Sequence, residues 1–472
     1  MLSLQKTRIV ATIGPASESP EMLARLIRAG MNVARLNFSH GDFSAHAARI
    51  AHIRQAEREA GSPVAIMADL PGPKMRIGAI DPEPIELRAG DAFCLTIDEV
   101  AGNAERVSVS FGRLPEVVKP GDRLFLNDGL VQLKVERADA RHVYCTVTAG
   151  GELRSRKGLN LPGIDLGISA FTDHDRACLE FALAQGVDAV SQSFVETAAD
   201  IDAVRHAAAA SGRQPFIIAK IERAGALAHL DEILRAADGI MVARGDLGVE
   251  VPLEDIALTQ KQIIAKANLA GKPVITATQM LESMVSSRLP TRAEATDVAN
   301  AVLDGTDALM LSAESAMGRY PEDAVATLAR IAAAVEVRRP ATRLEELRRQ
   351  CFDQRPGSAA EAVATVVEHA LETVPCVAAF VPTRTGTTAR MIARFKPSVW
   401  IVAYTKDAAV RQGLLFSYGV LPIHLAEDPS DWRGVAREWT RAEGLDGGVG
   451  MLVAGPSSKF PDANHRIEFM RI

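Results

Sequence analysis

The sequence predicts an α/β protein: a TIM (β/α)8 barrel with an inserted small all-β domain and a C-terminal α/β domain. Three observations predict this architecture. Apolar runs alternate with helix-like segments through much of the chain, one long interval breaks that alternation, and a second α/β region follows the barrel. We expect residues 1–71 and 169–339 to form the barrel, residues 72–168 the insertion, and residues 340–472 the last domain.

The barrel is predicted from eight short runs whose hydrophobicity is continuous rather than alternating, as in parallel strands covered on both faces. Amphipathic helical stretches such as Glu21 to Ala29 and Asp200 to Ala210 lie between them. The eight runs are Arg8 to Ile13, Asn32 to Phe38, Val64 to Leu70, Asp188 to Phe194, Phe216 to Ile221, Gly239 to Arg244, Pro273 to Gln279 and Ala308 to Ala313.

The insertion is predicted from a change of texture between about Pro73 and Gly167. Short apolar runs there are separated by Gly- and Pro-containing turns such as Lys119 to Asp122 and Asn127 to Gly129, which is typical of a small β domain. We expect the insertion to begin in the loop that follows the carboxyl end of the third strand. Its expected strands are Ile85 to Leu87, Ala92 to Ile97, Arg106 to Ser110, Arg123 to Leu126, Gln132 to Glu136 and Val143 to Thr148.

The last α/β domain is expected to follow a connection from Arg338 to Gly357 that is rich in Arg, Glu and Pro. Its expected strands are Val377 to Pro382, Val399 to Thr405, Val420 to Leu425, Met451 to Gly455 and Ile467 to Ile472.

Composition excludes several classes of function. Of 472 residues, 47% are hydrophobic and 24% charged, the balance of a globular protein, and no apolar run approaches the roughly 18 residues that span a bilayer. We therefore expect a cytoplasmic protein with no membrane partner. A net charge of −6 without a basic stripe argues against nucleic acid as a partner. Five scattered cysteines without a C-x-x-C pair indicate reduced thiols.

Chemically useful residues stand at the predicted carboxyl ends of the strands, where TIM barrels place their active sites. Carboxylates are Mg²⁺ ligands, and cations neutralise a transferring phosphoryl group. After strand six, Gly245 and Asp246 precede Pro252 and a helix-like run from Glu254, whose backbone N–H groups would suit an anion. No G-x-x-x-x-G-K-[ST] loop is present. The strand-end set comprises the cations Arg35, Lys74, Arg76 and Lys220, the carboxylates Asp69, Glu222 and Asp246, and the hydroxyls Ser39 and Thr278.

Each of these residues also has a structural explanation. Arg35 or Arg76 alone would more often be a salt-bridge residue. Lys220 and Glu222, two apart on a strand, would share one face as an ion pair. Asp69 could cap a turn. Their joint location at one barrel face favours a ligand site, because burying so many charges without one would be costly.

Over nearly its whole length the chain resembles the pyruvate kinase family, and the resemblance rests on several long motifs in the family's order. It implies a three-domain enzyme that transfers the phosphoryl group of phosphoenolpyruvate to ADP. The motifs are Lys6 to Pro15, Asn32 to Gly41, Lys157 to Gly163, Lys220 to Glu222, Met241 to Gly248, Ala277 to Met284 and Pro290 to Glu294.

The resemblance also implies roles for matched positions. Glu222 and Asp246 would hold Mg²⁺, Lys220 and Arg35 would contact the phosphoryl group, and Thr278 would lie beside the enolate carbon. Backbone at Gly245 and Asp246 would bind the substrate carboxylate, and the β domain would close as a lid. The phosphate and nucleotide side would comprise Arg76, Lys157, His40, Asn37 and Pro15.

Two departures from the family pattern are informative. Where many members have a glutamate that accompanies a bound K⁺, this chain has Lys74. We therefore expect Lys74 to replace the monovalent cation and K⁺ not to be required, although Asn37, Ser39, Asp69 and Leu70 match the K⁺-site positions. A Lys74 that merely points to solvent is the alternative. Met317 replaces a family lysine near the nucleotide, which leaves the preference among nucleoside diphosphates open.

A possible effector loop follows the first strand of the last domain. The family places sugar-phosphate activators on a similar loop, whereas the structural alternative is an ordinary helix cap. The loop residues are Thr383, Thr385, Gly386, Thr387 and Thr388. The family also leads us to expect a homotetramer.

Two other functions compete with this interpretation. A Schiff-base aldolase would use Lys220 as a neutral nucleophile in a desolvated pocket, but Glu222 and Asp246 favour its charged form. A non-catalytic sensor of phosphorylated metabolites would not need the complete set of site residues that this chain has kept.

Overall fold

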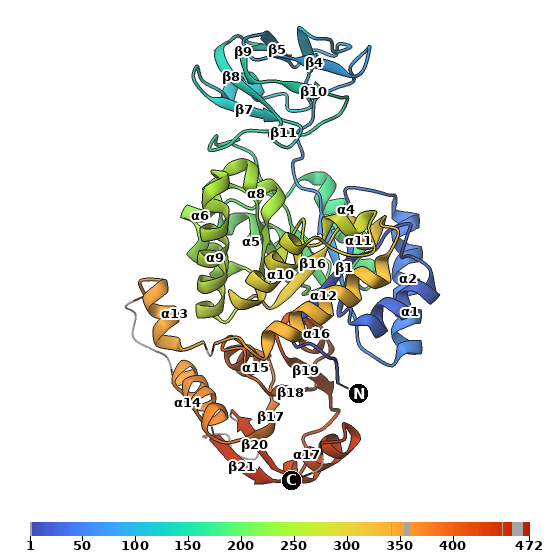
Figure 1. Ribbon diagram of the computed structural model, residues 1–472, viewed down its shortest axis with the longest axis vertical. Coiled ribbons are helices and arrows are strands. Elements are labelled where there is room, and N and C mark those ends of the chain that lie inside the picture. Colours follow the sequence, from blue (N-terminus) through green and yellow to red (C-terminus); the bar gives the residue numbers. More distant parts are fainter. Residues whose placement is uncertain (1, 341, 354–358, 446, 456–465) are drawn as a thin grey trace.

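The structure is a computed structural model that describes the chain except residues 1, 341, 354–358, 446 and 456–465. The predicted connection from Arg338 to Gly357 therefore lies partly outside the described residues. Figure 1 shows three stacked bodies: a β domain at the top, a barrel in the middle and an α/β domain below.

The central body is a closed barrel of eight parallel strands, and all eight predicted runs contribute one strand each. The order around the barrel is β1-β16-β15-β14-β13-β12-β3-β2. The strands are β1 (Arg8–Thr12), β2 (Val33–Asn37), β3 (Ala65–Leu70), β12 (Ala189–Gln192), β13 (Phe216–Ile221), β14 (Gly239–Ala243), β15 (Val274–Ala277) and β16 (Ala308–Leu311).

Helices cover the outside of the barrel because the strands are apolar on both faces. The first helix shows how locally the ends are set: Ser19 caps it by accepting from the N–H of Met22, Pro20 opens its first turn, and Gly30 ends it. The larger helices are α1 (Pro20–Ala29), α2 (Phe43–Ala60), α4 (Asp173–Ala184), α5 (Ala198–Ala210), α9 (Ile256–Ala270), α10 (Arg292–Leu303) and α12 (Pro321–Glu336). Shorter ones are α6 (Ala224–Ala228), α7 (Leu230–Ala236), α8 (Arg244–Glu250), α11 (Ala313–Ala316) and the 3-10 turns η1 (Leu253–Asp255) and η2 (Glu282–Val285).

The segment after strand six differs from prediction. The sequence suggested a helix from Glu254, but the chain turns directly from β14 into α8 at Arg244, and α9 starts only at Ile256. Gly245 and Asp246 therefore lie in the first turn of α8 rather than in a loop before a helix. Two glycines hid this turn, because glycine has poor helix propensity.

The inserted body contains a six-stranded sheet of order β11-β7-β8-β9-β5-β6 and a two-stranded sheet of β10 and β4. Alternate side chains of β8 point into its core, as expected for a half-buried strand. The elements are β4 (Ile85–Leu87), β5 (Ala92–Thr96), β6 (Arg106–Ser108), α3 (Leu114–Val117), β7 (Arg123–Leu126), β8 (Val131–Ala138), β9 (His142–Ala149), β10 (Gly151–Leu153) and β11 (Leu159–Asn160).

The last body is a five-stranded sheet of order β19-β18-β17-β20-β21, parallel except for the antiparallel β21. Each predicted strand is present. The elements are β17 (Cys376–Pro382), β18 (Trp400–Thr405), β19 (Val420–His424), β20 (Val449–Ala454), β21 (Arg466–Arg471), α13 (Leu344–Gln350), α14 (Ala359–Thr373), α15 (Thr387–Ala393), α16 (Ala408–Gly413), η3 (Leu414–Phe416) and α17 (Trp432–Ala442).

The amino-terminal mouth of the barrel is sealed by the last domain. Leu415 and Phe416 of η3 pack into the cluster formed by the lower ends of the barrel strands, and Phe416 stacks on Phe216 at 5.2 Å between ring centroids. Lys396 pairs with Asp307 at 2.6 Å beside this plug. The carboxyl-end mouth is consequently the one that remains for ligands. Among the described residues, no helix is both long and apolar enough to cross a membrane.

Candidate functional site

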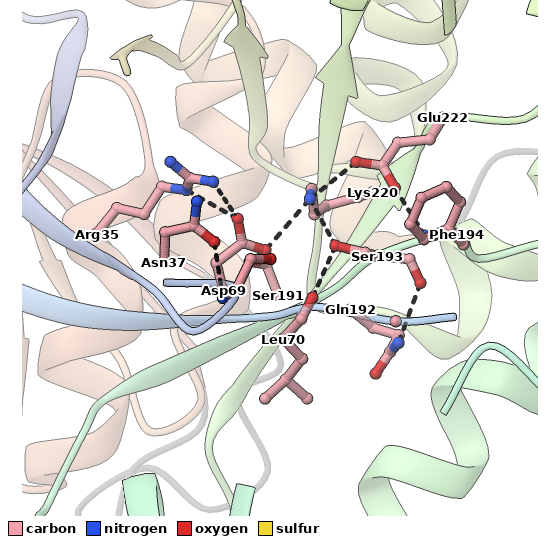
Figure 2. A network of polar contacts seen from close by, with 12 residues as sticks. Arg35, Asn37, Asp69, Leu70, Ser191, Gln192, Ser193, Phe194, Lys220 and Glu222 are labelled. Carbon is pink, nitrogen blue, oxygen red and sulfur yellow. Dashed lines mark hydrogen bonds and ion pairs between the residues drawn. The ribbon is translucent and has the colours of Figure 1, made fainter. Parts of the chain in front are cut away.

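A buried chain of charges crosses the carboxyl-end mouth of the barrel (Figure 2). Arg35 at the end of β2 donates from Nε to Asp69 Oδ2 at 2.8 Å. The other Asp69 oxygen lies 3.3 Å from Lys220 Nζ, and Lys220 in turn pairs with Glu222 Oε1 at 2.8 Å. Four residues from three strand ends thus form one network of alternating sign.

The network keeps its members ionised despite burial. Burial disfavours the charged form of Lys220, but Asp69 and Glu222 outweigh it and raise the pKa of Lys220 above its ordinary value. Burial also opposes ionisation of Asp69, yet Lys220 and Arg35 lower its pKa. Lys220 is therefore an ammonium held in place at neutral pH.

Serine side chains and one backbone N–H complete the network. Ser193 Oγ accepts from Lys220 Nζ at 2.6 Å and donates to the carbonyl of Leu70 at 2.7 Å. Ser191 donates to Asp69 at 2.7 Å. The N–H of Phe194, a residue held at φ 58°, donates to Glu222 Oε2 at 2.7 Å. These bonds fix the direction in which each charge points.

Thr278 occupies a strained backbone position at the end of β15. Its φ is 72°, which is a true outlier for a β-branched residue. Arg244 Nη2 donates to its carbonyl at 2.7 Å and is itself anchored by Asp297, which Arg244 Nη1 contacts at 2.7 Å. The N–H of Gly245 donates to Thr278 Oγ1 at 3.2 Å, and a Cβ on Gly245 would lie only 3.0 Å from Thr278 Cγ2. Thr278 and the first turn of α8 are therefore placed together.

Glu222 and Asp246 fit a divalent cation. Burial, reinforced by the negative charge of Glu222, raises the pKa of Asp246 to about 6, against the opposing charges of Lys220 and Lys74. None of the described residues forms a hydrogen bond or ion pair with the Asp246 carboxylate. A positively charged ligand would supply the partner for this carboxylate. Within the described part of the chain, no three His, Cys, Asp or Glu side chains group as a metal site. A cation here would rest on two carboxylates together with water and substrate, as Mg²⁺ commonly does.

The residues matched to a monovalent-cation site lie on the same side. Asn37 Oδ1 accepts from the N–H of Ser39 at 3.1 Å, Asp69 belongs to the charge network, and Leu70 offers a carbonyl already bonded to Ser193. Lys74 is exposed, and its ammonium makes no hydrogen bond or ion pair with the described residues. Burial of part of the side chain and repulsion from Lys220 lower the pKa of Lys74, whereas Asp69, Asp246 and Glu222 oppose the shift. The Lys74 ammonium thus interacts electrostatically with the charges of the site, although it forms no hydrogen bond or ion pair with a described residue.

The residues assigned to the nucleotide side are spread along the rim. His40 is exposed, and desolvation together with Lys74, Arg76 and Arg35 lowers its pKa, which places it beside three cations. Arg76 is exposed and donates to the carbonyl of Arg156 at 2.9 Å. Lys157 is half-buried and Pro15 is exposed, and Met317, which replaces a family lysine, is 72% exposed.

The lid reaches toward α8 through the tip of the β7–β8 hairpin. Asn127 and Asp128 have φ of 52° and 55°, and the position of a Cβ on Gly129 lies 3.6 Å from Val249 Cγ1 of α8. The charge of Asp128 also contributes to raising the pKa of Asp246. The lid tip therefore overhangs the two-carboxylate side of the mouth.

The predicted effector loop forms a tight turn before α15, far from this mouth (Figure 1). Gly386 has a φ of 78° and donates its N–H to Thr383 Oγ1 at 2.9 Å, and the hydroxyls of Thr385 and Thr387 lie 2.9 Å apart. Arg390 donates to the carbonyl of Thr385 at 2.8 Å. Thr388 is half-buried at the start of α15.

Sequence reasoning missed some partners of these residues, and one alternative that it left open can be excluded. The alternative in which Asp69 caps a turn is wrong, because its oxygens bind Arg35, Ser191 and Lys220. Thr12, whose Oγ1 accepts from Arg35 Nη1 at 2.9 Å, was not singled out. Ser191 and Ser193, two apart at the end of the fourth predicted run, gave the available signal that both side chains face the same side.

A closed (β/α)8 barrel with buried cations and two carboxylates at one mouth matches what an enzyme of the phosphoryl-transfer class needs. Comparison with known proteins names the group more narrowly. Profiles described as "Pyruvate kinase, barrel domain" and "Pyruvate kinase, alpha/beta domain" match residues 4–325 and 361–445. The chain belongs to the pyruvate kinase family, a family of phosphotransferases that generally use Mg²⁺.

Individual relatives support this membership over the full fold. Pyruvate kinase of Thermococcus litoralis is 47% identical over 429 residues, which cover 90% of this chain and 90% of the relative. Pyruvate kinase of Geobacillus stearothermophilus is 44% identical over 88% of this chain and 71% of its own length. The crystal structure of a pyruvate kinase from Cryptosporidium parvum superposes with a TM-score of 0.90 at 37% identity, covering 99% of this chain and 96% of that one.

Proposed function

We propose that this protein transfers the phosphoryl group of phosphoenolpyruvate to ADP, giving pyruvate and ATP in glycolysis. The observation that carries the proposal is the buried Arg35–Asp69–Lys220–Glu222 network beside Asp246. It presents fixed positive charge at the point where a family substrate would place its phosphoryl group, and positioning with charge stabilisation accounts for most catalysis of phosphoryl transfer.

Each residue at the mouth has a defined task in this reaction. Lys220 and Arg35 contact the phosphoryl oxygens and stabilise their charge, because both are cations that the network orients. Backbone at Gly245 and Asp246 receives the substrate carboxylate, and Thr278 lies beside the enolate carbon that must gain a proton. Glu222 and Asp246 would hold Mg²⁺, whose positive charge would help to neutralise the phosphate.

The nucleotide side is formed by the rim and the lid. His40, Arg76, Asn37 and Pro15 belong to the barrel or its junction with the lid, and Lys157 belongs to the lid itself. Closure of the lid over the mouth would exclude water from the transferring group. The overhanging Asp128 tip is consistent with a short closing movement.

The ionic state of Lys220 argues against the aldolase alternative. A Schiff base requires a neutral amine, whereas Asp69 and Glu222 raise the pKa of Lys220 and keep it charged. Borohydride trapping with pyruvate should therefore leave Lys220 unmodified.

A coupled assay that follows pyruvate formation from phosphoenolpyruvate and ADP tests the main proposal. The wild type should be active, and Lys220→Met should lose at least about a hundredfold in kcat, because one preorganised charge contact is worth roughly 10²–10³. Lys266→Met removes a half-buried lysine outside the site, paired with the exposed Asp231, and serves as the control. Wild-type protein that forms no pyruvate, or a Lys220→Met variant with unchanged kcat, contradicts the proposal.

We also propose that the reaction does not require K⁺, since the Lys74 ammonium supplies a positive charge on the monovalent-cation side. The wild type should have the same rate in tetramethylammonium as in K⁺ buffer. Lys74→Glu should become K⁺-dependent, with the rate restored by added K⁺. A large K⁺ activation of the wild type would overturn this idea and leave the proposed reaction intact.

Three further properties rest on family resemblance. We propose a cytoplasmic homotetramer in which the loop from Thr383 to Thr388 accepts a sugar-phosphate effector. The exposed hydroxyls of Thr385 and Thr387 and the left-handed Gly386 support an anion-binding turn. Activation by fructose 1,6-bisphosphate or a related sugar phosphate in the wild type, lost in Thr385→Val/Thr387→Val, would support the effector proposal.

A further inference from the structure

A groove of about 540 Å³ opens on the rim between helices α1 and α2. It lies between the β1–α1 loop and the amino-terminal half of α2, both of which start from the carboxyl-end mouth. Its volume falls within the roughly 300–1,000 Å³ typical of small-molecule sites. The groove is therefore large enough for a base and its sugar and opens on the side of the barrel that carries the proposed reaction.

One part of the groove is lined by apolar side chains. Pro15 lies on the loop, Met22 on α1, and Ala45 and Ala48 on α2. The two alanines are small, so the space between loop and helix is not filled by side chains from this chain.

The other part of the groove is polar and is organised around Arg49. Arg49 Nε donates to Glu18 Oε2 at 2.8 Å, and His52 Nδ1 lies 2.9 Å from the carbonyl of Glu18. No described residue accepts a hydrogen bond from Arg49 Nη1 or Nη2. The guanidinium is thus held by one edge while its other N–H groups have no partner, and only 15% of its side chain is exposed.

The groove lies close to the phosphate side of the proposed active site. Pro15 lies three residues after Thr12, and the Thr12 hydroxyl accepts a hydrogen bond from Arg35. Arg49 Nη1 lies 3.3 Å from the position of a Cβ on Gly41, the neighbour of His40. A nucleotide whose base lies against Arg49 would extend its phosphates past His40 toward Arg35 and Arg76.

We propose that Arg49, oriented by Glu18, is a specificity-determining residue of this groove and makes the protein prefer guanine over adenine in its nucleoside diphosphate substrate. The inference rests on the proposed function and adds a preference for one base. The sequence left that preference open, because Met317 replaces a family lysine near the nucleotide.

The preference follows from the hydrogen-bonding groups of the two bases. Guanine presents two adjacent acceptors, O6 and N7, which match the paired donors of a guanidinium. Adenine presents an amino group in place of O6, which sets donor against donor. A good bidentate pair discriminates by roughly five- to hundredfold, and a groove open to water should lie near the lower end of that range.

The test compares kcat/KM for GDP, IDP and ADP at saturating phosphoenolpyruvate. IDP has O6 and N7 but no 2-amino group, so it isolates the contact assigned to Arg49. We expect GDP and IDP to exceed ADP by about fivefold or more, mainly through a lower KM, because the base lies away from the reacting atoms. Metal-free binding of GDP and ADP, measured by calorimetry, should show the same order without catalysis.

Variants of Arg49 locate the effect. Arg49→Met should bring the GDP/ADP ratio to within about twofold of one, and Arg49→Lys should fall between, since lysine lacks the paired donors. The ion pair with Glu18 is partly exposed, so its loss should not unfold the protein. Arg28→Met, an exposed arginine of α1 outside the groove, should keep the wild-type ratio.

The outcomes separate the two proposals. Turnover with all three nucleotides at equal efficiency, or an Arg49→Met ratio equal to the wild-type ratio, contradicts the role of Arg49 and leaves phosphoryl transfer intact. A wild-type preference for ADP contradicts it as well, because Glu18 would then accept from the adenine amino group. Absence of turnover with every nucleoside diphosphate contradicts the proposed function itself.

Discussion

The two mouths of the barrel each contain a buried lysine, and the two lysines differ in what surrounds them. Lys220 at the carboxyl-end mouth lies between two carboxylates, Asp69 and Glu222, which raise its pKa. Lys396 at the amino-terminal mouth has one, Asp307, and burial lowers its pKa to about 8, although Asp307 opposes the shift.

The surroundings of each lysine match the use of that mouth. The carboxyl-end mouth has Thr278 and Phe194 in left-handed backbone conformations and an Asp246 carboxylate that no described residue binds, and the proposed ligands would account for all three. The amino-terminal mouth is closed by Leu415 and Phe416. One barrel thus concentrates reactivity at one end and domain attachment at the other, as the fold generally does.

The largest effect is expected from opening the sealed mouth. Phe416→Ala removes a fully buried ring that stacks on Phe216, and it should lower the free energy of unfolding by about 3–5 kcal/mol. The urea midpoint measures the loss, and kcat at 25 °C should stay within about twofold of the wild type. Phe352→Ala, at a ring 90% exposed, is the control. A stable but inactive Phe416→Ala variant would show that the two mouths are not separate in function.

Breaking the charge network at the carboxyl-end mouth should have the next largest effect. This effect should be on kcat rather than on the free energy of unfolding. Asp69→Asn leaves Arg35 and Lys220 without their shared carboxylate, so kcat should fall by about 10²–10³. Steady-state kinetics with a thermal-unfolding check measures it. Asp231→Asn, at the exposed partner of Lys266, should match the wild type. An Asp69→Asn variant that keeps its kcat would mean that the network does not orient the catalytic cations.

The smallest effect is the pH dependence of the free energy of unfolding that arises from Lys396 at the sealed mouth. An unfolded lysine titrates near 10.4, whereas Lys396 titrates at about 8 in the folded chain. Between these values the unfolded state binds more protons at this site, so its contribution to the free energy of unfolding rises with pH, by at most about 1.4 kcal/mol per pH unit. Below pH 8 both states carry the charge and the contribution is constant. Asp307, Tyr418 and Arg339 are the titratable groups beside it.

Urea midpoints of the wild type and Lys396→Met from pH 7.5 to 10 measure this slope. The wild-type midpoint should rise relative to the variant above pH 8. Parallel profiles would show that Lys396 does not titrate in that window.

Much of the fold was accessible from the sequence because local rules and tertiary structure agree. The eight barrel strands are continuous apolar runs, and their neighbours begin with capped helices such as that after Ser19. The start of α8 at Arg244 was not accessible, since Gly245 and Gly248 mask a helix that forms where Arg244 anchors Thr278. The seal by Leu415 and Phe416 was also missed, because an apolar run in the last domain reads as that domain's own core.

The candidate site, like the fold, could be predicted from the sequence only in part. Motifs identified the charged residues, and strand ends implied their convergence, but no pattern indicates that Asp69 bridges Arg35 and Lys220. Nor does spacing show that Arg49 meets Glu18, since the pair spans 31 positions and joins two different helical segments. The left-handed backbone at Thr278 runs against the preference of a β-branched residue, so only tertiary contacts hold it there.

Binding of Mn²⁺, followed by electron paramagnetic resonance without nucleotide and with phosphoenolpyruvate, tests the central claim most directly. Wild-type protein should bind one ion at this mouth, and Glu222→Gln and Asp246→Asn should each weaken it by at least about tenfold. Glu254→Gln, at an exposed carboxylate on η1, should leave the affinity unchanged. Equal Mn²⁺ affinity in all four proteins would contradict the assignment of the carboxyl-end mouth as a metal-assisted phosphoryl-transfer site.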